Sequence, residues 1–240
     1  MTFSPLVVWH DVECGRYAAD LGLWRKLAAA QRGAVLDVGA GTGRVALDLA
    51  RAGHHVTALD REPVLLQALA ARARAVGVAV STESADARGF SLARTFALVV
   101  VPMQTVQLLP ERAGFLACAR RHLDPGGLLA VAIAVGLEDF DAEGEDTLPA
   151  PDVGTAAGWR FASQPTAVRS LPAATRIERV RRSFAPDGRV IEEQDLIELA
   201  HVTVAQLEAE GLAAGFVPEP ARHIPATADH VGSEVVLLRA

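Results

Sequence analysis

The chain has 240 residues, of which 50% are hydrophobic, and a formal net charge of −6 at pH 7. This length and apolar content predict one globular domain with a sizeable core. The negative charge argues against a nucleic-acid partner, because binding to many phosphates depends on clustered Lys and Arg. The N-terminus does not combine a basic start with a long apolar run, and no later run is long enough to span a bilayer. We therefore expect a cytoplasmic protein without a membrane partner.

The two cysteines, Cys14 and Cys118, lie far apart in the sequence. Neither stands in a Cys-x-x-Cys or Cys/His pattern with the spacing of metal ligands. We predict two reduced thiols and no metal site.

The first half of the chain alternates short β-branched runs with alanine-rich helical stretches, a pattern typical of βα units and a parallel sheet. Glycines end several of the predicted helices, and Pro63 suits the first turn of another. The turn "DPGG" at 124–127 precedes the fifth strand. In chain order we predict a helix over 17–31, a strand over 34–39, a helix over 43–53, a strand over 55–60, a helix over 64–77, and strands over 78–86, 96–104 and 128–136.

The composition and the apolar pattern of the sequence change after residue 137. An acidic segment rich in Gly and Pro, 138–154, has no apolar period and predicts a surface loop. Short alternating runs follow around the turn "PDG" at 186–188, which predicts antiparallel hairpins that form a small lid or insertion. These runs are 159–164, 166–171, 175–184 and 189–200, and after them we predict a helix over 204–215 and strands near 216–224 and 234–240.

The most informative stretch is "AVLDVGAGTGR" at 34–44, where a predicted strand turns through three glycines into a helix. Such a loop presents backbone N–H groups at the carboxyl edge of a parallel sheet, and both dinucleotides and S-adenosylmethionine bind there. The dinucleotide pattern G-x-G-x-x-G requires a third glycine where this chain has Arg44, since Gly43 falls one residue early. Dinucleotide binding is therefore less favoured.

Two acids follow the next strands. Asp60 ends the second predicted strand roughly 20 residues after the glycines, where a carboxylate can accept both hydroxyls of an adenosine ribose. Asp86 follows the third strand at the same sheet edge, where a short polar side chain can reach an adenine amino group. The loop and the two acids together favour S-adenosylmethionine.

The ordered motifs resemble those of the class I S-adenosylmethionine-dependent methyltransferases, in the branch that acts on small molecules. The segments that carry this resemblance are "VLDVGAGTGRVALDLARAGHHVTALD", "ADAR" and "HLDPGGLLAV", with a weaker continuation in "VTVAQLEAEGLAAGF". The resemblance implies an α/β Rossmann-like sheet of seven strands, mostly parallel with the last strand antiparallel, with helices on both faces and a small antiparallel β insertion as lid. It also implies S-adenosylmethionine as cofactor, S-adenosylhomocysteine as product and no metal.

The resemblance also assigns the cofactor-binding residues. Gly39, Ala40 and Gly41 would form the backbone cradle for the methionine part, with Asp37 orienting nearby donors. Asp60 would take the ribose. The remaining assignments are Arg61, Asp86 and Ala87 at the adenine, Val101 and Met103 beneath the methionyl group, Tyr17 closing over the cofactor, and Arg44 in contact with ligand or paired with an acid.

We expect a single methyltransferase domain over 1–240. Within it, 1–32 is an N-terminal helical cap, 33–137 the cofactor-binding core, 138–202 the acidic loop and β insertion on the acceptor side, and 203–240 the last helix and strands.

Fewer signals point to the acceptor. Gln104 and Gln107 follow the fourth strand at the carboxyl edge and can hydrogen-bond an acceptor. His201, between the insertion and the last helix, is the candidate general base or acceptor contact. The arginine run at 176–182 favours a charged hairpin over an anion site.

The favoured function is transfer of a methyl group to an N or O nucleophile of a small-molecule acceptor, mainly by positioning and desolvation. A non-catalytic S-adenosylmethionine-binding partner or sensor stays open. An NAD-dependent oxidoreductase is less favoured, because the single lysine, Lys26, has no tyrosine four residues before it. The sequence leaves open the acceptor, the methylated atom, the use of a general base, and whether the protein is a monomer or a homodimer.

Overall fold

The computed structural model describes residues 3–142 and 149–240. Contacts divide the chain into two compact units, each described here by itself. The first unit comprises Met1–Tyr17 and Gly136–His201, and the second comprises Ala18–Val135 and Val202–Ala240. The predicted insertion thus begins and ends within two residues of a unit boundary. The N-terminal helices of the predicted cap, however, are divided between the units. The division of the chain into one domain stays a prediction.

The second unit is built on a seven-stranded sheet with the strand order β11-β12-β5-β4-β1-β2-β3. The pairs formed by β1 to β5 are all parallel, whereas β12 runs antiparallel to both β5 and β11. The predicted sheet, with its last strand antiparallel, is confirmed. Its strands are β1 (Val35–Val38), β2 (Val56–Asp60), β3 (Val80–Ser84), β4 (Phe96–Val101), β5 (Leu123–Ala134), β11 (Val217–Ile224) and β12 (Ser233–Arg239).

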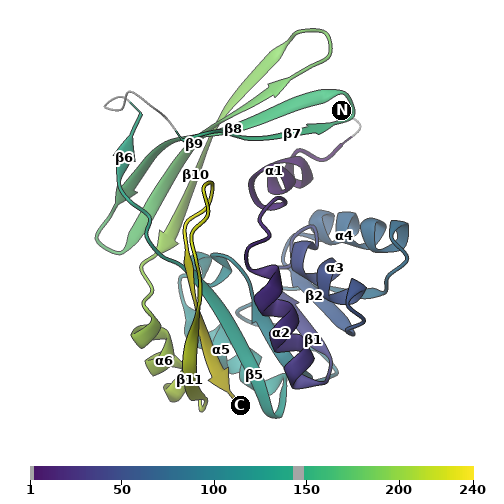
Figure 1. Cartoon of the computed structure of the whole chain (residues 1–240), viewed down its shortest axis with the longest axis vertical. Helices are drawn as coiled ribbons and strands as arrows, with labels where there is room; N and C mark the ends of the chain where they lie inside the picture. The colour runs from purple at the N-terminus through teal and green to yellow at the C-terminus, as the bar shows by residue number, and fades with distance from the viewer. Residues whose placement is uncertain (1–2, 143–148) are drawn as a thin grey trace. The chain divides into compact units, whose positions relative to one another are not determined.

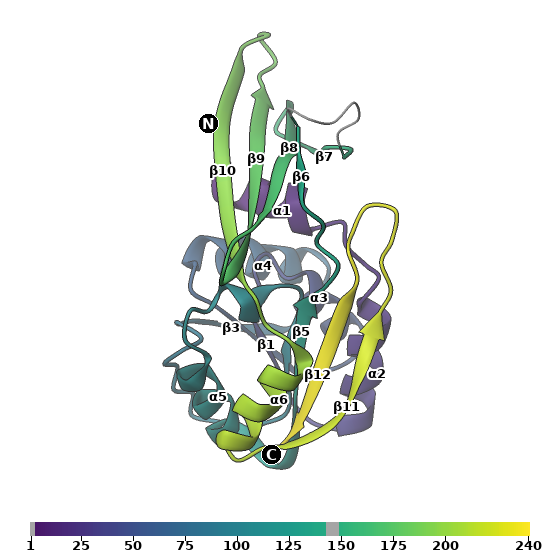
Figure 2. The ribbon, with the colours of Figure 1, turned by 90° about the vertical axis from the view of Figure 1, so that its left-hand side faces the viewer.

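Helices cover both faces of this sheet, with α2, α3 and α4 on one face and α5 and α6 on the other (Figures 1 and 2). The central strands β1 and β4 consist of apolar residues apart from Asp37 in β1, as expected for strands with both faces covered. A capping box between Thr203 and Gln206 begins α6. The helices are α2 (Leu21–Gln31), α3 (Arg44–Arg51), α4 (Pro63–Ala75), α5 (Arg112–Arg121) and α6 (Val204–Ala213), with a short 3₁₀ helix, η1 (Thr105–Leu108), after β4.

The "DPGG" segment is not the turn before β5 that the sequence predicts. It lies inside β5, where Leu123 pairs with Phe96 and Leu128 with Leu98, so the extra residues form an irregularity in the ladder. Gly126, with φ of +75°, takes the left-handed conformation that this irregularity requires.

The first unit is a five-stranded antiparallel sheet packed against α1 (Pro5–Cys14). The two runs predicted at 159–164 and 166–171 form one strand, β8, whose register shifts at Pro165, where a missing N–H is tolerated. The predicted acidic loop contributes β6 and the start of β7, so it is not loop throughout, and its residues 143–148 lie outside the described residues. The strands are β6 (Phe140–Asp141), β7 (Asp152–Ala156), β8 (Trp159–Ser170), β9 (Ala174–Phe184) and β10 (Val190–Ala200), in the order β10-β9-β8-β6 with β7 paired to β8.

Candidate functional site

The glycine loop connects β1 to α3 at the carboxyl end of the parallel strands. Gly39 and Gly43 have φ of +71° and +97°, and both are held by close neighbours. A Cβ on Gly39 would lie 2.5 Å from Cγ2 of Thr105 in η1, and one on Gly43 would lie 2.6 Å from Cγ of Leu69 in α4. At these two positions a side chain is excluded because η1 and α4 pack closely against the backbone.

Asp60 joins the end of β2 to this loop. Its carboxylate accepts hydrogen bonds from the backbone N–H of Gly41 at 2.8 Å and from that of Glu62 at 3.0 Å. An ionised carboxylate has about four lone-pair sites, so these bonds leave acceptor capacity for a ligand. Asp60 therefore lies at the sheet edge where the sequence predicts it and orients one of the glycine N–H groups.

The segment after β3 lies beside the end of β2, because the N–H of Ala85 donates to the carbonyl of Asp60 at 3.1 Å. Asp86 in this segment is exposed and accepts hydrogen bonds from both the backbone and the guanidinium of Arg88, which lower the pKa of Asp86 to about 2. The neighbouring Ala87 is half-buried. The exposed side chain of Arg61 pairs with Glu62 at 3.3 Å. The predicted ribose and adenine residues thus come together at one edge of the sheet.

Asp37, in β1, is a buried acid with only 1% exposure. Neither of its carboxylate oxygens has a hydrogen-bond partner among the described residues. Burial raises the pKa of Asp37 to about 7, and the charge of Arg44 opposes this rise. Burying a carboxylate without a hydrogen-bond donor lowers the stability of the fold, so the position of Asp37 needs an explanation.

Arg44, the first residue of α3, forms a bidentate ion pair with Asp20 at the start of α2. Nη1 and Nη2 of Arg44 donate to the two carboxylate oxygens of Asp20 at 2.5 and 2.8 Å, and the Trp24 indole N–H donates to the same carboxylate at 2.7 Å. All three side chains are largely buried. The sequence is compatible with Arg44 in contact with ligand or paired with an acid, and in the structure it is paired with an acid. Asp20 was not predicted, although its spacing of four residues from Trp24 would place the two side chains on one side of the predicted helix.

The exit of β4 carries the remaining predicted residues of this unit. Val101 is fully buried, and Met103 takes φ of +56°, a left-handed conformation that is uncommon for a residue with a side chain. Gln104 is half-buried, whereas Gln107 is buried and its side-chain oxygen accepts a 2.7 Å hydrogen bond from the N–H of Ala134 in β5. This bond gives Gln107 a structural role.

Two predicted residues belong to the first unit. Tyr17 is buried, and His201 is exposed with its Nε2 3.2 Å from the hydroxyl of Thr175. Their roles in cofactor or acceptor binding stay predictions.

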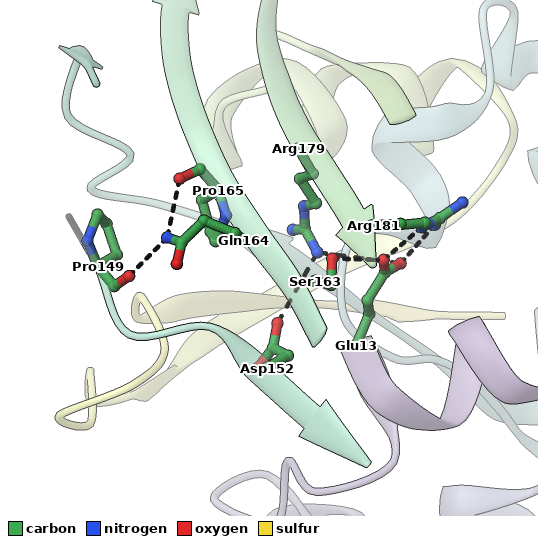
Figure 3. A network of polar contacts seen from close by, with 8 residues as sticks. All are labelled: Glu13, Pro149, Asp152, Ser163, Gln164, Pro165, Arg179 and Arg181. Carbon is green, nitrogen blue, oxygen red and sulfur yellow. Dashed lines mark hydrogen bonds and ion pairs between the residues drawn. The ribbon is translucent and has the colours of Figure 1, made fainter. Parts of the chain in front are cut away.

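The arginine run of β9 lies in a network of ion pairs. Figure 3 shows Glu13 of α1 pointing at Arg181 of β9 and Ser163 of β8. Arg181 donates two hydrogen bonds of 2.7 Å to Glu13 and pairs with Asp195 at 2.7 Å. Arg179 lies farther from its partners, with Nη1 3.9 Å from an oxygen of Glu13. These arginines already face carboxylates, as the charged-hairpin interpretation requires.

Within residues 3–142 and 149–240, no group of three or more His, Cys, Asp or Glu side chains is arranged to hold a metal ion. In the same residues, no helix has the length and apolar character needed to cross a membrane.

Comparisons with known proteins agree with this geometry. Residues 35–127 match a family described as a methyltransferase domain. A ubiquinone biosynthesis O-methyltransferase from Rhizobium johnstonii is 28% identical over 132 residues, which make up 54% of this chain and 52% of that protein. The chain thus spans about half the length of this curated relative.

Two solved structures share the fold over nearly their full length. One is an amino pentose methyltransferase, CalS10, from Micromonospora echinaspora, with a TM-score of 0.74 and 23% identity over 100% of this chain and 98% of that chain. The other is the sugar N-methyltransferase KedS8 from a Streptoalloteichus species, with a TM-score of 0.75 and 20% identity over 100% of this chain and 95% of that chain. The predicted resemblance to Rossmann-like methyltransferases is confirmed.

Proposed function

We propose that this protein transfers a methyl group from S-adenosylmethionine to an N or O nucleophile of a small-molecule acceptor and releases S-adenosylhomocysteine. The observation that carries the proposal is the meeting of Asp60, Asp86 and the glycine loop at one edge of the sheet, within the part of the chain that matches the methyltransferase domain. We place the reaction in the cytoplasm.

The residues at this edge fit the parts of the cofactor. Asp60 keeps lone pairs for a ribose diol while it orients the N–H of Gly41. Gly39, Ala40 and Gly41 would border the methionine part. Arg61, Asp86 and Ala87 would border the adenine, and Val101 and Met103 would form the wall beneath the methionyl group.

Asp37 fits the remaining polar end of the cofactor. Its buried carboxylate has no hydrogen-bond donor among the described residues, and an amino acid ammonium group would supply both the donor and the positive charge. This fit matches the buried carboxylate of Asp37 with the ammonium cation at the amino acid end of the cofactor.

S-Adenosylmethionine supplies a methyl group that its positively charged sulfur already activates, so the chain needs no nucleophile of its own. The task of the protein residues is to hold the acceptor in line and to exclude water. Positioning of this kind can contribute about 7 to 11 kcal/mol. Gln104 would hydrogen-bond the acceptor. Because CalS10 is an amino pentose methyltransferase and KedS8 is a sugar N-methyltransferase, amino sugars are the first acceptors to test.

Calorimetry of the purified chain with S-adenosylmethionine and with NAD tests the cofactor. We expect binding of S-adenosylmethionine, and we expect Asp60→Ala to weaken it by about 1.5 to 3 kcal/mol through the loss of charge-assisted hydrogen bonds. Asp187→Ala, which removes an exposed acid of a hairpin turn, is the matched control and should bind like the wild type. Tighter binding of NAD, or an unchanged dissociation constant for Asp60→Ala, would contradict the proposed site.

An acceptor screen coupled to detection of S-adenosylhomocysteine tests the reaction. Product formation with amino sugars or other small amines and alcohols supports the proposal. Cofactor binding without any product, together with capture of a protein partner, would favour the non-catalytic alternative.

A further inference from the structure

The buried carboxylate of Asp37 lies among other charged groups. Arg44 comes from α3, Asp20 from α2 and Asp60 from β2, and the backbone N–H of Ala46 in α3, which does not form a well-aligned hydrogen bond to Asp37, also favours its charged form. Of these groups, Arg44 acts most strongly in favour of the charged form, whereas Asp20 and Asp60 act against it. Arg44 is therefore the arginine that favours the charged form of Asp37 while it is paired with Asp20.

Arg44 is not available to a ligand in this arrangement. Its two terminal nitrogens are engaged with Asp20, and its side chain is only 10% exposed. Asp20 is held in turn by the indole of Trp24, which is fully buried. Bidentate pairs of this kind fix the guanidinium in both position and orientation.

We propose that Arg44, held by Asp20, is a positioning residue that does not touch the cofactor and instead keeps Asp37 negatively charged for the α-ammonium group of S-adenosylmethionine. The inference rests on the proposed function, since it concerns the same cofactor. Arg44 then acts on the ligand only through Asp37, and Asp20 fixes the position of the Arg44 guanidinium.

The pKa of about 7 gives this arrangement a measurable signature. Below that pH, Asp37 is protonated, and a ligand with an ammonium group must displace the proton on binding. Affinity for such a ligand should fall roughly tenfold between about pH 8 and about pH 6. A ligand without the ammonium group should show no such fall.

Isothermal titration calorimetry with two ligands tests the inference. S-Adenosylhomocysteine carries the α-ammonium group, which stays protonated over this range, and 5′-methylthioadenosine lacks the whole amino acid part. For the wild type we expect the affinity for S-adenosylhomocysteine to fall roughly tenfold between about pH 8 and about pH 6, and binding at about pH 6 to release a proton. Neither effect is expected with 5′-methylthioadenosine. Proton release is measured by repeating the titration in buffers with different heats of ionisation. Asp37→Asn should abolish both effects.

The variant Arg44→Gln should move the affinity profile of S-adenosylhomocysteine to higher pH. A displacement of one pH unit weakens binding at about pH 7 roughly fivefold, while 5′-methylthioadenosine binds as before. Arg25→Gln is the matched control, because Arg25 and Asp48 also join α2 to α3 but do so at the surface. The double variant Asp20→Asn, Arg44→Gln avoids an unpaired buried acid, and its profile should move in the same direction, because Arg44 affects Asp37 more than Asp20 does.

The outcomes separate the inference from the proposed function. If the wild type binds S-adenosylhomocysteine with a flat pH profile and without proton release, the inference is overturned and the cofactor assignment stands. An Arg44→Gln variant that weakens both ligands equally would also overturn it, since Arg44 would then act on the loop as a whole. A wild-type protein that binds neither ligand overturns the proposed function and the inference together. The wild-type measurements decide the matter even where a variant does not fold.

Discussion

Asp37→Asn measures what the buried carboxylate in β1 costs the protein without ligand. Burial raises the pKa of Asp37 from 3.8 to about 7. Because the pKa in the folded state is the higher one, the protonated form stabilises the fold below the unfolded-state value, and this stability is lost as the pH rises through about 7. The difference corresponds to about 4 kcal/mol at about 1.4 kcal/mol for each pH unit.

An asparagine at this position does not titrate, so it removes the pH-dependent part of the cost. We expect the stability of Asp37→Asn relative to the wild type to increase by roughly 2 to 3 kcal/mol between about pH 5 and about pH 8. At the same time the variant should bind S-adenosylhomocysteine more weakly, as expected where a strained site serves binding.

Urea unfolding of both proteins at several pH values, followed by fluorescence, is the assay. Asp187→Asn, which removes an exposed acid of a hairpin turn, controls for general effects of charge. A stability difference between wild type and Asp37→Asn that stays constant from about pH 5 to about pH 8 would refute the reasoning, because it would mean that Asp37 does not titrate in this range.

Three further substitutions test local parts of the structure. Gly39→Ala should destabilise the protein by about 2 to 4 kcal/mol in urea unfolding, because the added Cβ would lie 2.5 Å from Thr105. The control Gly53→Ala also has a positive φ, but its Cβ would meet nothing within 4 Å, so it should cost only about 1 kcal/mol. Equal costs for the two variants would show that the contact with Thr105 does not destabilise Gly39→Ala. Gln107→Leu should lower the free energy of unfolding by about 1 to 3 kcal/mol, since the buried N–H of Ala134 in β5 loses its acceptor. An unchanged midpoint of urea unfolding would show that this hydrogen bond does not contribute to stability. Glu13→Gln should cost about 2 to 4 kcal/mol near neutral pH. Burial alone would raise the pKa of Glu13, but its arginine partners lower it, so the deficit should shrink as the pH falls below about 4.5; a deficit that grows in acid would contradict this sign.

Local pattern was sufficient for most of the elements. Side chains repeat along strands and helices with fixed periods, so the parallel strands, the helices α2, α3 and α4 and the glycine loop were predicted within about five residues, whereas α5 was not predicted. Asp60 and Asp86 were found in the same way, because the ends of parallel strands meet at one sheet edge. The parallel sheet and the placement of these two acids at one of its edges therefore follow from short stretches of sequence read in order.

Local pattern failed where a segment is shaped by its partner strand. "DPGG" has the composition of a turn, yet it lies within β5 because the register against β4 shifts there. The acidic segment after residue 137 lacks an apolar period, yet part of it pairs with β8 as β6 and β7. In both cases hydrogen bonds to a distant strand outweigh local preference.

The sequence by itself determined which segments form the sheet and which acids lie at its carboxyl edge, since both depend on neighbours along the chain. Only the tertiary structure decided what those side chains do. Arg44 meets Asp20 across 24 residues, Gln107 meets Ala134 across 27, and Asp37 has no donor among the described residues, so burial dominates its pKa. Charge pairing and burial depend on distances in space, and no spacing along the chain encodes them.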